Sequence, residues 1–166
     1  MIVALSGWKE SGKSTVADYL VRTHKFRKLS FAAPLKAEVR RAGFCNVLAK
    51  PTPPHIRRLL QAWGQARRAE DPDYWIRLMD AELNQRSLFD EHFVIDDLRF
   101  LNEYNYLHGR GAHMIRIQRM NQRSEDTDIS EHDLDDVPFD WHFGAVYGDI
   151  NSLQKQMEFF MQEVAR

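Results

Sequence analysis

The stretch "GWKESGKST", residues 7 to 15, directly follows the run "IVALS", residues 2 to 6. A short run that is apolar up to its last residue is typical of a buried strand, and from Lys13 onward the apolar residues recur at helical spacing. The spacing G-x-x-x-x-G-K-S matches the phosphate-loop (P-loop) pattern without a mismatch, in the strand-to-helix context that the pattern requires. The stretch therefore predicts a loop that binds the β and γ phosphates of a nucleoside triphosphate.

Each residue type in this loop has a chemical reason to be there. Glycines let the backbone turn so that successive N–H groups point inward, and the positive end of the following helix adds to the anion site. We expect Lys13 to reach the outer phosphates and Ser14 to ligate Mg²⁺. The loop residues expected to contact the nucleotide are Gly7, Lys9, Ser11, Gly12, Lys13, Ser14 and Thr15. A P-loop alone does not name a reaction, because switches, motors and small-molecule kinases share it.

Short apolar strands alternate with helical patterns along the chain, which predicts one α/β domain, residues 1–166, of the P-loop NTPase fold, built on a parallel sheet of about five strands flanked by helices. The sequence contains no repeat, low-complexity tract or linker. Strands are expected at 2–6, 28–32, 92–96, 112–118 and 142–148. Helices are expected from residue 13, at 34–41, 55–66 and 72–86, up to about Gly109, and at 150–164.

Composition excludes several classes of protein. The single cysteine, Cys45, cannot form an internal disulfide, and no secretory signal pattern opens the chain. No apolar stretch approaches the roughly 18 residues that span a bilayer, so we expect a cytoplasmic protein without a membrane partner. The net charge of -1 provides no field that would attract a nucleic acid polymer, which disfavours a packaging ATPase.

A second group of polar residues, in "VIDDLRF" at 94 to 100, follows an apolar strand. Open α/β sheets place their ligand crevice at this end of the strands. Asp96 or Asp97 can hold Mg²⁺ there, directly or through water, although capping of the next helix is the alternative interpretation. Arg99 would face the same crevice, where its planar donor fork suits a phosphate.

Arginines elsewhere in the chain suggest a second anion. Arg67 or Arg68, together with Arg99, could hold an acceptor that is itself a phosphate, while solvated helix faces are the alternative. The long polar stretch 119–140 is a candidate lid. Arginines on a closing lid often supply charge to the transferring group, and the candidates are Arg116, Arg119 and Arg123.

Four blocks in order resemble the deoxynucleoside monophosphate kinases of bacteriophages, relatives of the wider nucleoside monophosphate kinase group. These blocks are "GWKESGKST", "LSFAAPLK" at 29–36, "LLQAWGQARRAEDPDYWI" at 59–76 and "VIDDLRFLNE" at 94–103. A weaker similarity continues through "IRIQR" and "SEHDLDD" into the C-terminal part of the chain.

The resemblance implies ATP and Mg²⁺ on one side and a deoxynucleoside monophosphate on the other. It implies that the helical insertion 51–86 binds the acceptor and that about 119–131 form a mobile lid. Asp97 and Arg99 match the Asp-x-Arg of the fourth block, so the resemblance ranks Asp97 above Asp96 as a metal ligand. It places Arg116 and Arg119 near ATP or the transferring phosphoryl group. The residues that it places at the acceptor are Phe31, Lys36, Gln61, Arg67, Arg68, Trp75 and Arg99.

We therefore expect transfer of the ATP γ-phosphoryl group to a deoxynucleoside monophosphate, which gives ADP and a deoxynucleoside diphosphate. Two alternatives share the donor loop: a kinase of another small metabolite, of the dephospho-coenzyme A or phosphomevalonate type, and a non-catalytic nucleotide-dependent switch. The expected partners are small-molecule nucleotides and no nucleic acid polymer, and a homodimer is left open. A phage-encoded protein would act in the host cytoplasm.

Overall fold

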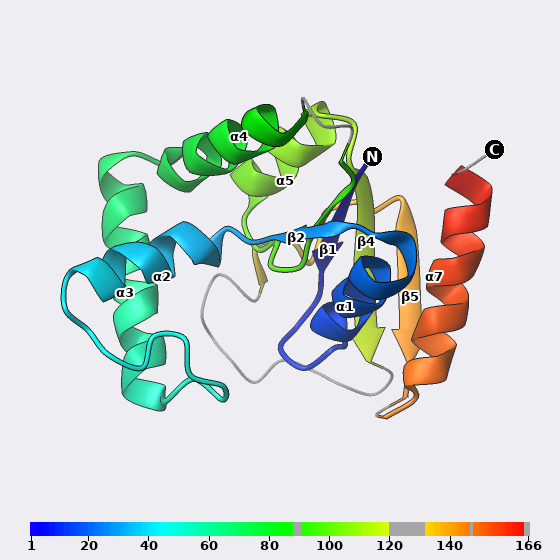
Figure 1. The fold of residues 1–166 in the computed structure, drawn as a ribbon, viewed down its shortest axis with the longest axis horizontal. Helices are drawn as coiled ribbons and strands as arrows, with labels where there is room; N and C mark the ends of the chain where they lie inside the picture. Colours follow the sequence, from blue (N-terminus) through cyan, green and yellow to red (C-terminus); the bar gives the residue numbers. More distant parts are fainter. Residues whose placement is uncertain (88–90, 120–131, 147, 165–166) are drawn as a thin grey trace. The chain divides into compact units, whose positions relative to one another are not determined.

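The computed structural model describes residues 1–87, 91–119, 132–146 and 148–164 (Figure 1). Its contacts divide the chain into two compact units. Unit 1 comprises Met1–Leu29 and Glu91–Arg166, and unit 2 comprises Ser30–Asp90. Unit 1 holds the sheet, and the regular elements of unit 2 are helices.

Unit 1 is built on a five-stranded sheet of order β2-β3-β1-β4-β5 in which every neighbouring pair is parallel. The prediction of an α/β fold with a parallel sheet of about five strands is confirmed. The central strand β1 pairs with β3 on one side and β4 on the other. The carboxyl end of β1 is therefore the topological switch point of the sheet, where ligands bind in open α/β folds. The strands are β1 (Ile2–Ser6), β2 (Arg27–Leu29), β3 (Phe93–Ile95), β4 (His113–Arg119) and β5 (Trp141–Ala145).

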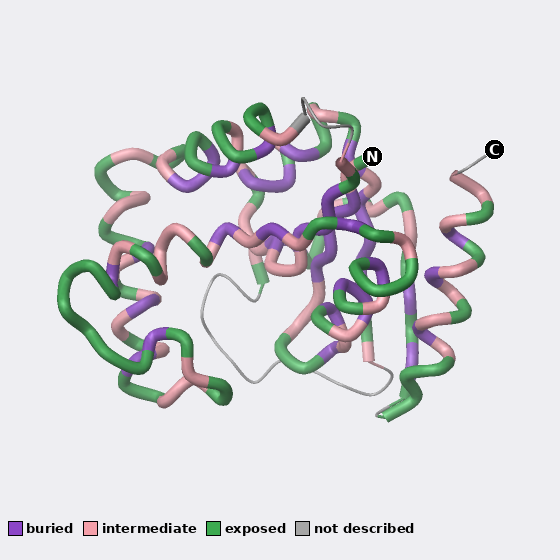
Figure 2. Tube along the Cα trace, viewed as in Figure 1, coloured by how far each residue is buried: buried purple, intermediate pink, exposed green. Residues whose placement is uncertain are grey.

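Two amphipathic helices fill the main core of unit 1. Helix α1 (Lys13–His24) turns Val16, Ala17 and Leu20 toward the sheet, and α7 (Ile150–Val164) packs beside it. Most residues of β1 and β4 are buried, as the purple tube in Figure 2 shows. The buried residues of α7 are Leu153, Met157 and Phe160, which recur at helical spacing. Helix α5 (Leu101–Gly109) follows the turn after β3.

Unit 2 consists of α2 (Ala32–Arg41), α3 (Pro54–Glu70) and α4 (Tyr74–Ser87). Its small core is formed by the buried residues Val39, Val47, Ile56 and Leu60. Trp75 is 2% exposed, and its indole N–H donates to the Gly64 carbonyl at 3.3 Å, which joins α4 to α3.

The largest differences from the predicted element boundaries are at the ends of β2, α3 and β5; the other bounds agree to within two residues. Strand β2 ends at Leu29 instead of residue 32, because α2 begins at Ala32 and the Ser30 hydroxyl accepts the Ala32 N–H at 3.2 Å. Pro34 thus lies inside the first helical turn, where a missing N–H costs no hydrogen bond. Helix α3 continues to Glu70, so that Arg67 and Arg68 lie on its last turn. Strand β5 spans Trp141–Ala145 and not 142–148; Gly148 has a φ of 84°, which no strand adopts.

No helix in the described ranges is long and apolar enough to cross a membrane.

The first glycine of the P-loop lies against the neighbouring strand. Gly7 has a φ of 145°, and a Cβ at this position would lie 2.1 Å from the carbonyl oxygen of Ile117 on β4. Replacing Gly7 with Ala should therefore lower the free energy of unfolding by about 1–3 kcal/mol, since backbone must move against backbone. Urea denaturation measures this loss. The matched control is Gly109→Ala at the end of α5, where nothing lies within 4 Å of the added carbon; it should leave stability unchanged or raise it. A Gly7→Ala protein as stable as this control would contradict the packing.

Candidate functional site

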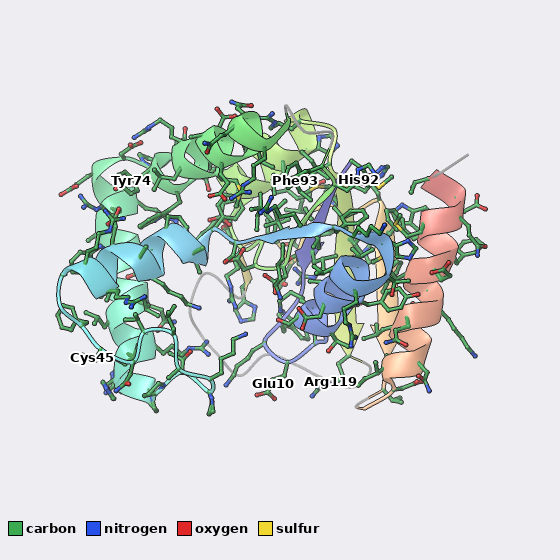
Figure 3. The ribbon with its side chains drawn as sticks, in the orientation of Figure 1. Glu10, Cys45, Tyr74, His92, Phe93 and Arg119 are labelled. Carbon is green, nitrogen blue, oxygen red and sulfur yellow. The ribbon has the colours of Figure 1, made fainter. Side chains whose placement is uncertain are left out.

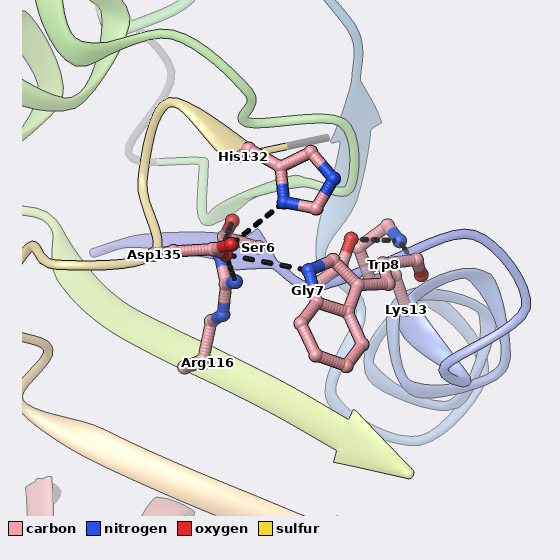
Figure 4. Close-up of polar contacts among 7 residues, drawn as sticks. All are labelled: Ser6, Gly7, Trp8, Lys13, Arg116, His132 and Asp135. Carbon is pink, nitrogen blue, oxygen red and sulfur yellow. Dashed lines mark hydrogen bonds and ion pairs between the residues drawn. The ribbon is translucent and has the colours of Figure 1, made fainter. Parts of the chain in front are cut away.

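The P-loop connects β1 to α1 and turns its lysine back over its own backbone. Lys13 Nζ donates to the carbonyls of Gly7 and Trp8 at 2.5 and 2.6 Å (Figure 4). Gly12, with a φ of 108°, precedes the first residue of the helix. The ammonium group and the positive end of α1 therefore lie together at the carboxyl end of the central strand, which is an arrangement suited to a polyanion.

One hydroxyl inside the loop stands out. Ser11 is 5% exposed, and its Oγ has no hydrogen-bond partner among the described residues. Buried polar atoms in proteins are nearly always satisfied, so an exception in a loop of this type points to a ligand that accepts its hydrogen bond. Lys9 is instead on the outside of the loop, 3.9 Å from the Glu10 carboxylate.

A second cluster joins α1, β2 and the end of β3. The Ser14 hydroxyl donates to Asp96 Oδ2 at 3.1 Å, and Lys28 Nζ lies 2.7 Å from the same oxygen. Burial by itself lowers the pKa of Lys28, but Asp96 and Asp18 outweigh it and raise the pKa above its ordinary value. The structure thus places Asp96 beside Ser14, whereas the family resemblance ranks Asp97 first.

The turn that follows β3 is fixed by a buried carboxylate. Glu103, 1% exposed, accepts the backbone N–H groups of Arg99 and Phe100 at 3.1 and 3.2 Å. The Asp133 carboxylate accepts the N–H of Leu101 at 2.7 Å, at the start of α5. These two acceptors hold the segment that carries Asp97 and Arg99.

The two arginines predicted on β4 contact the end of β1 and the P-loop. Arg116 Nη1 donates to the hydroxyl of Ser6 at 3.0 Å, and Arg116 Nη2 pairs with Asp135. Arg119 donates to the carbonyl of Glu10 within the P-loop, and the two residues lie together in Figure 3. Arg123 and most of the predicted lid, residues 120–131, lie outside the described residues.

The Asp135 carboxylate has partners on two other segments and in its own turn. Its partners are the Trp8 indole at 3.3 Å, His132 Nδ1 at 2.8 Å and the Arg116 guanidinium. Burial alone would raise the pKa of Asp135, but His132, Arg116 and Trp8 outweigh it and lower the pKa. Sequence reasoning missed Asp135 and Trp8, because Asp135 is one of many acidic residues between 125 and 140.

Unit 2 has its own carboxylate hub. Glu38 Oε2 accepts the Trp63 indole N–H at 3.0 Å and Arg67 Nε at 3.2 Å, and Tyr74 donates to Oε1. The Arg67 guanidinium also lies over the Tyr74 ring, 5.1 Å from its centroid. Glu38 was not predicted as a site residue, yet it orients Arg67, which was.

The other predicted acceptor residues are distributed over the three helices of unit 2. Phe31 precedes α2 and is 4% exposed, Lys36 lies on α2, and Gln61 and Arg68 lie on α3. Trp75 is a core residue of the unit, so its indole face is not available for stacking. An open hollow of about 450 Å³ is lined by Ala33, Lys36, Ala37, Arg40, Arg41 and Leu48, which brings three cations together.

The Glu38 hub generates a pH-dependent prediction. Burial alone raises the pKa of Glu38, but hydrogen bonds from Tyr74, Trp63 and Arg67 outweigh it, so the folded pKa lies below the ordinary value of 4.5. A carboxylate of this kind stabilises the fold above its unfolded pKa, and this contribution is lost as the pH falls through the folded pKa. Glu38→Gln should therefore cost about 1–3 kcal/mol at neutral pH, and its difference from wild type should shrink below about pH 4.5.

Urea denaturation at neutral and at acidic pH measures this difference. The control is Glu70→Gln, which removes an exposed carboxylate 3.6 Å from the same arginine and should cost no more than about 0.5 kcal/mol. Equal losses for the two variants, or a Glu38→Gln loss that does not change with pH, would count against the hub.

Comparison with solved structures supports the fold. A crystal structure of shikimate kinase from Aquifex aeolicus superposes with a TM-score of 0.51 at 16% identity, over 99% of this chain and 98% of that one. At this identity the likeness concerns the α/β P-loop fold and not the substrate.

Two sequence comparisons concern the family. A protein of Acanthamoeba polyphaga mimivirus named "Putative deoxynucleotide monophosphate kinase" is 27% identical over 170 residues, which cover 81% of this chain and 82% of the mimivirus protein. The family model "Deoxynucleotide monophosphate kinase" matches residues 43–143, more than half of the 166 residues. The protein thus belongs to the deoxynucleotide monophosphate kinase family and is an ATP-dependent phosphotransferase.

Proposed function

We propose that the protein transfers the γ-phosphoryl group of ATP to the phosphate of a deoxynucleoside monophosphate, which gives ADP and a deoxynucleoside diphosphate. The observation that carries this proposal is the range of the family match. Residues 43–143 include α3, α4 and the turn after β3, which carry most of the residues assigned to the acceptor, while Phe31, Lys36 and the P-loop that would bind the donor lie outside the match. The family match therefore supports the acceptor, and the P-loop pattern supports ATP as the donor.

The donor site is assigned to the P-loop. Gly7 and Gly12 have positive φ values, which allow a tight turn of N–H groups around phosphate oxygens. The hydroxyl of Ser11, which has no hydrogen-bond partner in the described part of the chain, and the ammonium group of Lys13 add two further donors. Lys9, Ser14 and Thr15 complete the set assigned to ATP.

The residues present also fit Mg²⁺. The Ser14 hydroxyl and the Asp96 carboxylate lie 3.1 Å apart and are hard oxygen ligands of the kind that this ion prefers. The described residues contain no group of three or more His, Cys, Asp or Glu side chains that could hold a metal ion. A site with few protein ligands is usual for Mg²⁺, which keeps waters and phosphate oxygens in its shell. When bound, the ion would neutralise charge on the β and γ phosphates.

The acceptor is assigned mainly to unit 2. Arg67, oriented by Glu38, and Arg68 would hold its phosphate, and Arg99 of unit 1 stays a candidate from the sequence pattern. Lys36 contributes a cation to the hollow on α2, and Gln61 and Phe31 would border the nucleoside. Trp75 would support this pocket from the core. Since a phosphate acceptor is already ionised near neutral pH, catalysis needs positioning and charge neutralisation more than a general base.

The first test is ADP release with Mg-ATP against dAMP, dGMP, dCMP, dTMP and the matching ribonucleotides. We expect one or more deoxynucleotides to stimulate turnover, and Lys13→Ala to lower kcat/KM by about 10²–10³-fold because a charged donor to the phosphates is lost. Turnover with dephospho-coenzyme A or phosphomevalonate alone would instead support a kinase of another metabolite. ATP binding that no acceptor accelerates would support a nucleotide-dependent switch.

A pair of neighbouring variants tests the metal assignment. Asp96→Asn should raise the Mg²⁺ concentration for half-maximal rate about tenfold, as expected for a residue that orders the metal site. Asp97→Asn, the matched control one residue along the chain, should change this concentration by less than about threefold. Mg²⁺ titrations of the initial rate at saturating ATP measure both. A larger effect of Asp97→Asn than of Asp96→Asn would instead assign the metal site to Asp97.

A further inference from the structure

Four side chains close a hydrogen-bonded ring around the first glycine of the P-loop. Arg116 Nη1 donates to the hydroxyl of Ser6, which precedes Gly7, at 3.0 Å. Arg116 Nη2 pairs with Asp135 Oδ1, and the same oxygen accepts the indole N–H of Trp8, which follows Gly7, at 3.3 Å (Figure 4). The ring therefore starts and ends on the two chain neighbours of Gly7.

Burial makes this ring costly to open. The Arg116 side chain is 6% exposed and that of Asp135 is 32% exposed, and removing one partner of a buried ion pair leaves the other charge poorly solvated. The second oxygen of Asp135 is used as well, because His132 Nδ1 lies 2.8 Å from Oδ2. Both carboxylate oxygens thus have partners, which fixes the orientation of the carboxylate.

The ring is connected to the lysine of the loop. Lys13 Nζ donates to the carbonyls of Gly7 and Trp8, the residue inside the ring and the residue that closes it. The hydrogen bond to Asp135 restricts the Trp8 side chain, and Lys13 binds the carbonyl of the same residue. A glycine-containing loop has large conformational freedom, and a contact that restricts it before ATP binds lowers the ordering cost of binding.

We propose that Asp135 is a positioning residue of the ATP site, which holds Trp8 and Arg116 together and thereby keeps the P-loop in its binding conformation. Asp135 acts through Trp8 and does not itself touch the nucleotide. The same geometry gives Arg116 a bracing role between β4 and the loop, in place of the phosphate contact expected from the sequence. The proposal rests on the proposed function only in that the loop binds ATP.

The test measures ATP affinity by calorimetry without any acceptor, for Asp135→Asn, Trp8→Phe and the double variant. Each single variant should weaken binding roughly three- to tenfold, as expected for the loss of one ordering hydrogen bond. The double variant should bind ATP no more weakly than the weaker single variant, because Asp135→Asn removes the charge that strengthens the contact and Trp8→Phe removes its donor. Trp8→Phe leaves the Arg116–Asp135 pair in place, so it still tests the idea if Asp135→Asn does not fold.

The control is Asp133→Asn, from the same segment. Asp133 accepts the N–H of Leu101 at 2.7 Å and so anchors the segment to α5 and not to the P-loop. It should leave ATP affinity within about twofold of wild type. Equal weakening by Asp133→Asn and Asp135→Asn, or additive effects of Asp135→Asn and Trp8→Phe, would overturn the proposal.

A spectroscopic readout separates this proposal from the proposed function. In an amide correlation spectrum of the full chain, the indole N–H signal that disappears in Trp8→Phe belongs to Trp8. We expect Asp135→Asn to shift this signal and Asp133→Asn to leave it in place. A Trp8 signal that is unchanged in Asp135→Asn refutes the contact, whereas the absence of turnover with every deoxynucleotide refutes the acceptor and leaves this result intact.

Discussion

The close approach of Gly7 to the carbonyl of Ile117 is the constraint on which the rest of unit 1 depends. Parallel pairing of β1 with β4 brings the two backbones together at the end of the sheet, and only a residue without a side chain fits there. At the other end of the loop, a Cβ on Gly12 would lie 2.7 Å from Leu153 of α7. The P-loop is thus held at one end by the sheet and at the other by a helix, and its interior is left for Lys13 and Ser11.

The two substrates are supported by different parts of the molecule. The P-loop lies outside the range of the family match, so the donor assignment depends on the geometry of residues 7–14. The acceptor assignment depends on the family, because the hollow of unit 2 brings three cations together without naming a ligand. The likeness to shikimate kinase spans nearly the whole chain but concerns the fold alone, because one fold can carry sites of different chemistry.

Local patterns predicted those features that local forces decide. The strand, the loop and helix α1 follow from apolar spacing and from glycine positions, and the parallel sheet follows from alternation. Local pattern could not decide between Asp96 and Asp97, because neighbouring residues in extended chain point in opposite directions. Only the folded structure shows that the Ser14 hydroxyl donates to Asp96. Trp75 was predicted as a pocket residue, yet its side chain is 2% exposed. Asp135 and Glu38 lacked any distinguishing local pattern.

The two carboxylates that the sequence did not predict, Glu38 and Asp135, share one physical property: each holds an arginine side chain in place. Glu38 orients Arg67 and Asp135 orients Arg116, so each carboxylate restricts an arginine that would otherwise have many rotamers. The same pairing also cancels charge, and the cancellation is most complete where burial excludes water. Arg116 is the more deeply buried of the two arginines and is therefore suited to bracing the fold. Arg67, with 38% of its side chain exposed, keeps a guanidinium that an anion can still approach.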